Sequence, residues 1–217
     1  MNQRETPVTQ RGRRTRQALL DAACEEFGTK GFYKASISSI TRRAGVAQGT
    51  FYLYYRSKEE ILRDLVAHMN REMRRAQSQA VEDVGDRIEQ ELAGLRHFIR
   101  FALHHRSLYR VVMESQFVDP EIHRQYYQTL ADRYADKLEA AQARDEVRPG
   151  DPCAQAWALI GVAYFMGMRF PVWEGKEPPA GFMETLEDFI AAALSPSVEE
   201  RHQAKQMQAE RAARRPN

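Results

Sequence analysis

The sequence has few of the features that mark a secreted or membrane-embedded protein. Its 217 residues include only two cysteines, Cys24 and Cys153, so no disulfide framework is expected. No run of about 18 apolar residues occurs, which argues against a transmembrane helix. The stretch from Met1 to Gln10 lacks the apolar segment of a signal peptide. We therefore expect a cytoplasmic protein.

Signs of catalysis are equally scarce. The chain has no spacing of metal ligands, no glycine-rich phosphate loop and no Ser-His-Asp order. We expect no catalytic residue, no metal site and no cofactor, and a function in binding rather than in catalysis.

Net charge is small, but it is unevenly distributed. The whole chain has 32 basic and 30 acidic residues, a net charge of +2. Through Lys58 there are 11 basic and four acidic residues, whereas the remainder has 21 basic and 26 acidic residues. A basic first quarter followed by an acidic remainder favours a DNA-binding head with a separate body.

The stretch from Ser36 to Glu60 has the pattern of a helix-turn-helix. Ser36 can cap a first short helix, and Gly45 can end it because glycine adopts a left-handed conformation without steric cost. A second helix is expected from about Gln48 to Tyr55, and Ser57 can cap a third. Two short helices joined by a turn of about three or four residues are typical of this DNA-binding motif.

The helix from Gln48 to Tyr55 presents an unusual mixture of polar and aromatic residues. Phe51 and Tyr55 lie four apart and are expected to face the core. On the other side, amide and hydroxyl groups can contact base edges and phosphates, and Leu53 can contact a thymine methyl. Lys58 lies among backbone N–H groups that favour a phosphate. The predicted DNA-binding residues are Ser36, Arg42, Arg43, Gln48, Gly49, Thr50, Tyr52, Leu53, Tyr54 and Lys58. The alternative is a plain helical hairpin whose tyrosines half-bury on a partner surface.

Five short motifs follow one another between Arg16 and Leu62. They are Ala22, Ala23 and Phe27; Gly31-Phe32; Ala44-Gly45-Val46; Gly49-Thr50-Phe51-Tyr52; and Ser57-Lys58-Glu59. This order and spacing resembles the TetR family of bacterial transcriptional regulators. Two positions depart from the family pattern: Thr41 stands where alanine is usual, and Tyr55 stands where phenylalanine is usual. Each departure adds a hydroxyl group to a position expected to be packed.

Beyond Ser57 the apolar periodicity is helical throughout, with no alternation typical of strands. An all-α chain of nine helices is expected, which is the number that the resemblance implies. Eight helices are expected over residues 13–28, 36–44, 48–55, 57–80, 85–104, 107–116, 119–144 and 152–170. Pro171 should end the eighth helix, and a ninth is expected after the loop 176–180.

The resemblance implies a three-helix head and a helical body for ligand binding and dimerisation. We expect a mobile basic arm over residues 1–12, a helix-turn-helix domain over 13–60, the body over 61–195 and a polar tail over 196–217. The arm is either a solubilising tail or a segment whose neighbouring arginines reach phosphates or a minor groove, and both interpretations stay open. These arginines are Arg11, Arg13, Arg14 and Arg16.

The stretch from Trp157 to Trp173 is apolar on nearly all sides and must be covered on several of them. In the TetR family the last two helices of each subunit form a four-helix bundle across a two-fold axis. The resemblance therefore implies a homodimer, with residues 152–170 and 181–194 at its centre.

Aromatic and methionine side chains are dense in the predicted body. Each of them can simply fill the core, but together they suggest an adaptable apolar cavity. Arg110 and Glu114 lie four apart and are expected to pair, although Arg110 or Arg169 could instead bind an acidic group of a ligand. The predicted ligand-binding residues are Phe98, Phe101, Tyr109, Arg110, Met113, Phe117, Tyr127, Tyr134, Trp157, Tyr164, Phe165, Met168 and Trp173.

The expected function is that of a homodimeric repressor on a palindromic operator in double-stranded DNA. The resemblance implies release by a small lipophilic or aromatic effector, with a weak preference for a fatty-acyl ligand. The alternative is an effector-independent DNA-binding or architectural protein, in which the aromatic side chains of the body only form its core.

Overall fold

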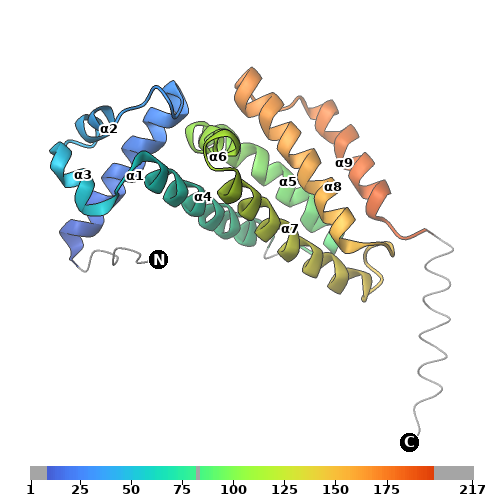
Figure 1. The fold of residues 1–217 in the computed structure, drawn as a ribbon. Helices are drawn as coiled ribbons and strands as arrows, with labels where there is room; N and C mark the ends of the chain where they lie inside the picture. Colours follow the sequence, from blue (N-terminus) through green and yellow to red (C-terminus); the bar gives the residue numbers. More distant parts are fainter. Residues whose placement is uncertain (1–8, 82–83, 198–217) are drawn as a thin grey trace, which may run out of the picture. The chain divides into compact units, whose positions relative to one another are not determined.

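The computed structural model describes residues 9–81 and 84–197. Within these ranges all regular structure is helical, which confirms the expected all-α fold with nine α-helices (Figure 1). The helices are α1 (Gln10–Lys30), α2 (Ile37–Arg43), α3 (Gln48–Tyr54), α4 (Lys58–Ala80), α5 (Arg87–His104), α6 (Arg106–Val118), α7 (Pro120–Gln142), α8 (Pro152–Gly167) and α9 (Ala180–Leu194), with a π-helix, η1 (Met168–Glu174), between the last two. No helix in the described ranges is both long and apolar enough to cross a bilayer.

The chain divides into two compact units. The first comprises the chain through Arg75 together with His104–Gln128, and the second comprises Ala76–Leu103 and the chain from Thr129 onward. Helix α6 therefore belongs to the same unit as the helix-turn-helix. The boundary expected at residues 60 and 61 stays a prediction, as does the function assigned to each side of it.

Helix α1 begins earlier than its apolar pattern indicates. Thr9 is its N-cap, and its hydroxyl accepts a hydrogen bond of 3.1 Å from the Gly12 amide. Because the helix starts at Gln10, Arg11 and the arginines after it lie on a helix rather than in an irregular arm. Residues 1–8 of the predicted arm lie outside the described residues. The apolar side of α1, which includes Leu19 and Phe27, is buried.

Helix α6 packs directly against the end of α1. A Cβ atom on Gly28 would meet the backbone and Cβ of Ser107, with the Ser107 carbonyl oxygen only 2.8 Å away, so the approach requires glycine. Both carboxylate oxygens of Glu114 accept from the Phe32 amide, at 2.8 and 2.9 Å. Arg110 donates to the Gly28 carbonyl at 3.3 Å. Both side chains thus bind the end of α1 and the loop after it, and the expected pairing of Arg110 with Glu114 stays a prediction.

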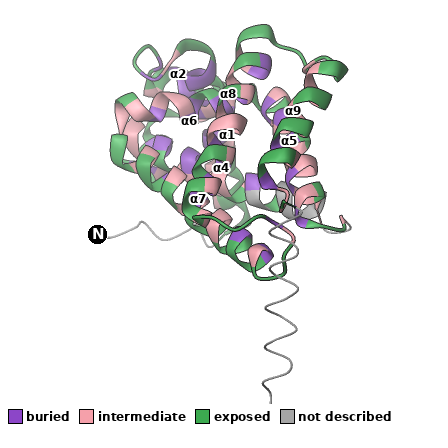
Figure 2. Cartoon of the chain, turned by 90° about the vertical axis from the view of Figure 1, so that its right-hand side faces the viewer, coloured by how far each residue is buried: buried purple, intermediate pink, exposed green. Residues whose placement is uncertain are grey.

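The core of the second unit joins α5, α7, α8 and α9. Figure 1 shows α8 and α9 next to each other, and Figure 2 shows exposed residues along α9. The buried cluster consists of Leu95, Ile99, Leu138, Ala141, Val147, Ala156, Ile190 and Leu194. In α9 the buried positions are Ile190 and Leu194, whereas Phe189 is 66% exposed, so apolar spacing alone does not decide which face of α9 packs into this core.

The expected end of the helix at Pro171 is wrong. Helix α8 gives way at Gly167 to η1, which contains the buried Pro171 and continues to Glu174. Proline lacks the N–H that an α-helix requires, and the chain responds by widening to the i+5 bonding of a π-helix. Gly175, with φ of 70°, ends the segment, and its amide donates to the Phe170 carbonyl at 2.7 Å.

Candidate nucleic-acid interface

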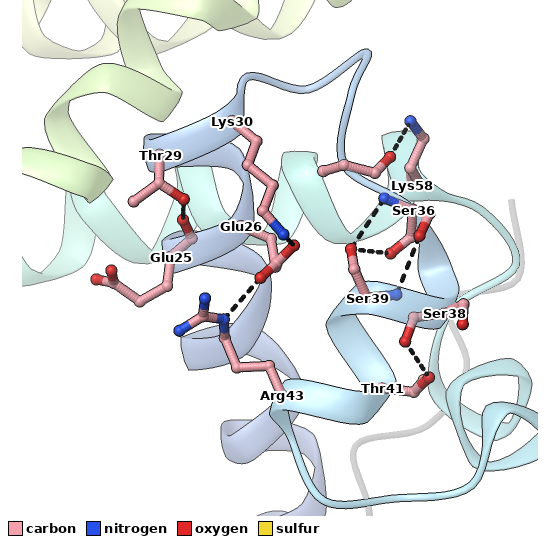
Figure 3. Close-up of polar contacts among 11 residues, drawn as sticks. Glu25, Glu26, Thr29, Lys30, Ser36, Ser38, Ser39, Thr41, Arg43 and Lys58 are labelled. Carbon is pink, nitrogen blue, oxygen red and sulfur yellow. Dashed lines mark hydrogen bonds and ion pairs between the residues drawn. The ribbon is translucent and has the colours of Figure 1, made fainter.

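Helix α2 begins with a reciprocal capping arrangement. The Ser39 amide donates to the Ser36 hydroxyl at 3.0 Å, and the Ser36 amide donates to the Ser39 hydroxyl at 3.1 Å (Figure 3). This satisfies two N–H groups that the first turn of a helix otherwise leaves unpaired. Gly45, with φ of 69°, follows the helix in the left-handed conformation expected from the sequence.

Helix α3 has one buried and one exposed side. Phe51 is fully buried and Tyr55 is almost fully buried, which confirms that these two residues face the core. Elsewhere on the helix Gln48, Tyr52 and Leu53 are exposed, and 70% of the Leu53 surface is accessible. An exposed leucine and tyrosine beside an amide form the kind of mixed surface that reads base edges and methyl groups.

All ten predicted DNA-binding residues are exposed or half-buried. Those exposed are Ser36, Arg42, Arg43, Gln48, Gly49, Tyr52 and Leu53, whereas Thr50, Tyr54 and Lys58 are half-buried. They lie on α2, α3 and the ends of the flanking elements, within one compact unit. Whether each of them contacts DNA stays a prediction.

Arg43 forms an ion pair with another residue of the chain, Glu26. Its Nε donates to Glu26 at 2.8 Å, and Lys30 donates to the other oxygen of that buried carboxylate at 2.6 Å (Figure 3). The hydrogen bond from Lys30, with further bonds from Ser39 and Arg43, outweighs burial and lowers the pKa of Glu26 from 4.5 to about 2. Arg43 thus ties the end of α2 to α1.

Lys58 also has an internal role. Its Nζ donates to the carbonyls of Phe32 and Ala35, both at 2.8 Å, and lies 4.5 Å from the centre of the Phe32 ring. An ammonium group has three protons, so these bonds use two of them. A phosphate contact at Lys58 would therefore use the third proton and would hold the loop before α2 at the same time.

The two hydroxyl groups that depart from the TetR pattern both have partners. Thr41 donates to carbonyls of its own helix, to Ile37 at 3.0 Å and to Ser38 at 3.2 Å. Tyr55 donates to Asp64 Oδ2 at 2.7 Å, and Arg16 donates to the same oxygen. Burial and the bond to Asp64 raise the pKa of Tyr55. Neither hydroxyl group is left unsatisfied in the packed head.

Asp64 and Glu26 are functional candidates that sequence reasoning missed. Glu26 is buried among the apolar positions of α1, next to Phe27, and Asp64 is half-buried at the edge of the apolar side of α4. A charge in such a position is costly unless a partner satisfies it. The position of Glu26 within the apolar face of α1 is a sequence signal that could have revealed it, whereas no such signal exists for Asp64.

The predicted ligand-binding residues divide between the two units. Tyr109, Arg110, Met113, Phe117 and Tyr127 belong to the first unit, and the other eight belong to the second. Tyr109 is buried; Arg110, Phe117, Trp157, Phe165 and Trp173 are exposed; the remainder are half-buried. Arg169, the other candidate for an acidic ligand group, donates to Glu174 at 3.1 Å and lies over the rings of Phe170 and Phe182.

A buried polar cluster lies in the second unit, and the sequence did not indicate it. Arg87 pairs with Glu91 one turn later on α5, and the Tyr134 hydroxyl donates to Glu91 from α7. Burial raises the pKa of Glu91 to about 7, even though Arg87 opposes this shift. Tyr134 therefore acts at least as a structural partner between α5 and α7.

Helices α2 and α3 form a helix-turn-helix, in which a capped short helix is followed by a glycine turn and a second helix with exposed polar and aromatic residues. This arrangement defines a DNA-binding protein of the helix-turn-helix class. Comparison with known proteins supports the same class of protein. Residues 19–65 match the model of "bacterial regulatory proteins, tetR family". The HTH-type transcriptional regulator YdgC of Bacillus subtilis is 31% identical over 192 residues, which cover 85% of this chain and 95% of that protein. The chain belongs to the TetR family and is a DNA-binding transcriptional regulator.

Solved structures show the same fold at low identity. GusR of Salmonella enterica has a TM-score of 0.74 and 21% identity, covering 86% of this chain and 98% of that one. The fatty acid degradation regulator FadR of Bacillus halodurans has a TM-score of 0.71 and 18% identity, covering 81% and 94% of the two chains.

Proposed function

We propose that this regulator is a cytoplasmic homodimeric repressor that binds a palindromic operator and leaves it when a small lipophilic or aromatic effector binds. It acts by binding and not by catalysis. The observation that carries the DNA-binding part is the exposed side of α3, where Gln48, Tyr52 and Leu53 are accessible while Phe51 is fully buried. The predicted residues around it on α2 and Lys58 would contact phosphates and fix the orientation on the duplex.

The dimer is proposed from apolar side chains that a single chain leaves exposed. Trp157 on α8 and Phe189 on α9 are 42% and 66% exposed, and Phe165 and Trp173 are also accessible. Exposed apolar groups gathered on two neighbouring helices favour a protein–protein interface. A two-fold dimer would present two α3 helices about 34 to 36 Å apart, matching half-sites one turn of DNA apart.

The effector is proposed from the aromatic and methionine content of the body. Half-buried rings such as Phe98, Phe101 and Tyr164 offer apolar contact without a fixed shape. A structural neighbour that regulates fatty acid degradation gives weak support for an acyl ligand. The alternative, a regulator without an effector, assigns these rings to packing alone.

The experiment begins with duplex DNA selected from a random pool by the wild-type protein. We expect a palindromic sequence, and we expect the double variant Gln48→Ala with Tyr52→Ala to lose about 30-fold or more in affinity for it, because two base contacts are removed. The measurement is fluorescence anisotropy with labelled DNA.

The matched control changes the same residue types elsewhere in the same unit, with Gln125→Ala and Tyr33→Ala, both of which are exposed. It should bind like the wild type. Selection of no sequence, or equal affinity of the α3 variant, would overturn the operator proposal. The complex is then challenged with fatty acids, acyl-CoA and aromatic compounds: release supports the effector, and uniform failure to release favours the alternative.

A further inference from the structure

The short helix α3 cannot hold its own position. It has seven residues, and its N-cap, Ala47, provides no side-chain hydrogen bond. Isolated helices of fewer than about 12 residues are marginal in water, so tertiary contacts must fix its place. Phe51 supplies one such contact through burial, but an apolar ring alone allows sliding and rotation.

A directional contact lies at the other end of α3. Tyr55 is the C-cap, with extended backbone at φ −136° and ψ 139°, and its amide donates to the Phe51 carbonyl at 2.9 Å. Its hydroxyl donates to Asp64 of α4 at 2.7 Å. Arg16 of α1 donates to the same carboxylate oxygen. One carboxylate of α4 thus connects the end of α3 to both α4 and α1.

The surroundings of this carboxylate strengthen the contact. The Asp64 side chain is 16% exposed and that of Arg16 is 33% exposed, so water competes weakly for the bonds. Hydrogen bonds to an ionised group are shorter and stronger than neutral ones. Arg71 is a more distant cation, 3.9 Å from the other oxygen of Asp64.

We infer that Asp64 and Tyr55 are positioning residues for operator recognition, which set the placement of α3 through the bond between them, with Arg16 holding Asp64 in place. The inference rests on the proposed function and assigns roles to residues that do not contact DNA themselves. The hydroxyl of Tyr55 is a departure from the usual TetR pattern, so a chain with phenylalanine at this position would lack this contact.

The physical consequence concerns specificity more than affinity. Tyr52, Leu53 and Tyr54 lie immediately before Tyr55 on α3. Base contacts need these side chains in one place, whereas attraction to phosphates tolerates small displacements. Loosening the end of α3 should therefore weaken binding to the selected operator and leave binding to random DNA unchanged.

The test compares Tyr55→Phe and Asp64→Asn with the wild type. Binding is measured to the duplex that the wild type selects and to random duplex of the same length. We expect Tyr55→Phe to lower operator affinity by about tenfold, with unchanged affinity for random DNA and an unchanged salt slope, since no charge is altered. In the double variant the two losses of operator affinity should be less than additive, because each substitution removes the same contact between Tyr55 and Asp64.

Thr41→Ala is the matched control. It removes a hydroxyl group from the other departure position, whose bonds stay within α2, and should leave the ratio of operator to random affinity unchanged. Thermal melting checks that all variants are folded. An unchanged ratio in Tyr55→Phe, or an equal fall on both DNAs, would overturn the inference. Selection of no sequence by the wild type would instead overturn the proposed function itself.

Discussion

At the scale of single residues, three carboxylates that are buried or half-buried connect the helices of this protein. Glu26 joins α1 to α2, Asp64 joins α3 to α1 and α4, and Glu91 joins α5 to α7. A buried charge costs free energy unless donors satisfy it, so each carboxylate selects one arrangement of its neighbours. The environments differ, because several donors lower the pKa of Glu26 while burial raises that of Glu91.

Glu26 makes the head sensitive to acid. Its pKa is about 2 in the folded protein and 4.5 as a free side chain, so the unfolded state takes up a proton first as the pH falls. The contribution, on the order of 3 kcal/mol, is present above pH 4.5 and is lost between about pH 4.5 and 2. Urea unfolding at pH 7, 4 and 3 gives the free energies of unfolding of the wild type and of Glu26→Gln. We expect the difference between them to shrink as the pH falls.

The control for this prediction is Glu25→Gln, a neighbouring carboxylate that is exposed on the same helix. Its free energy of unfolding should follow the wild type throughout the titration. A constant difference between the wild type and Glu26→Gln across this pH range would contradict the assignment.

At the scale of elements, the contact between α1 and α6 depends on the absence of a side chain at Gly28. A Cβ atom there would overlap the backbone of Ser107, and a helix backbone cannot yield as a flexible side chain can. The same contact includes the bonds from Arg110 to the Gly28 carbonyl and from the Phe32 amide to Glu114. A shift of α6 would therefore weaken polar bonds as well as packing.

We expect Gly28→Ala to lower the free energy of unfolding by roughly 1 to 3 kcal/mol, as overpacking usually does. Gly94→Ala on α5 is the matched substitution, since nothing lies within 4 Å of the added Cβ. There alanine should be neutral or stabilising by up to about 1 kcal/mol, because it is the better helix former. Chemical denaturation of both variants gives the comparison, and effects of the same sign would contradict it.

At the scale of the whole molecule, the exposed apolar side chains of α8 and α9 are the feature that a single chain does not explain. Phe189 is 66% exposed, so most of its surface is not part of the chain's own core. Replacing it by glutamate should leave folding intact and place a charge in the proposed dimer interface, where it would lack a partner.

We expect Phe189→Glu to shift the protein from dimer to monomer in sedimentation velocity at micromolar concentration, and to weaken operator binding in parallel. Tyr33→Glu, at an equally exposed aromatic residue in the loop after α1, should leave the oligomeric state unchanged. A wild-type protein that sediments as a monomer would remove the basis for the two-headed operator complex.

Local patterns were enough to predict much of the fold and the exposed side of the candidate site. Helical periodicity predicts all nine α-helices, and the Ser36 cap, the Gly45 turn and the buried pair Phe51 and Tyr55 lie where their spacing places them. Each of these depends on neighbours within a few residues, where steric and hydrogen-bonding rules are strong. The observed helix bounds differ from the expected ones, as in α1, which begins at Gln10 rather than at residue 13.

Only the tertiary structure decided which distant groups meet. Asp64 and Arg16 are 48 residues apart in the sequence, and Glu114 and Phe32 are 82 apart, so no local rule connects them. The same holds for the π-helix around the buried Pro171, where the chain stays helical past a residue that normally ends a helix. The sequence by itself determined the helices and the residues that α3 exposes. Long-range bonds to the half-buried Asp64 determined how α3 is held, because the donors that satisfy this carboxylate come together only in the folded chain.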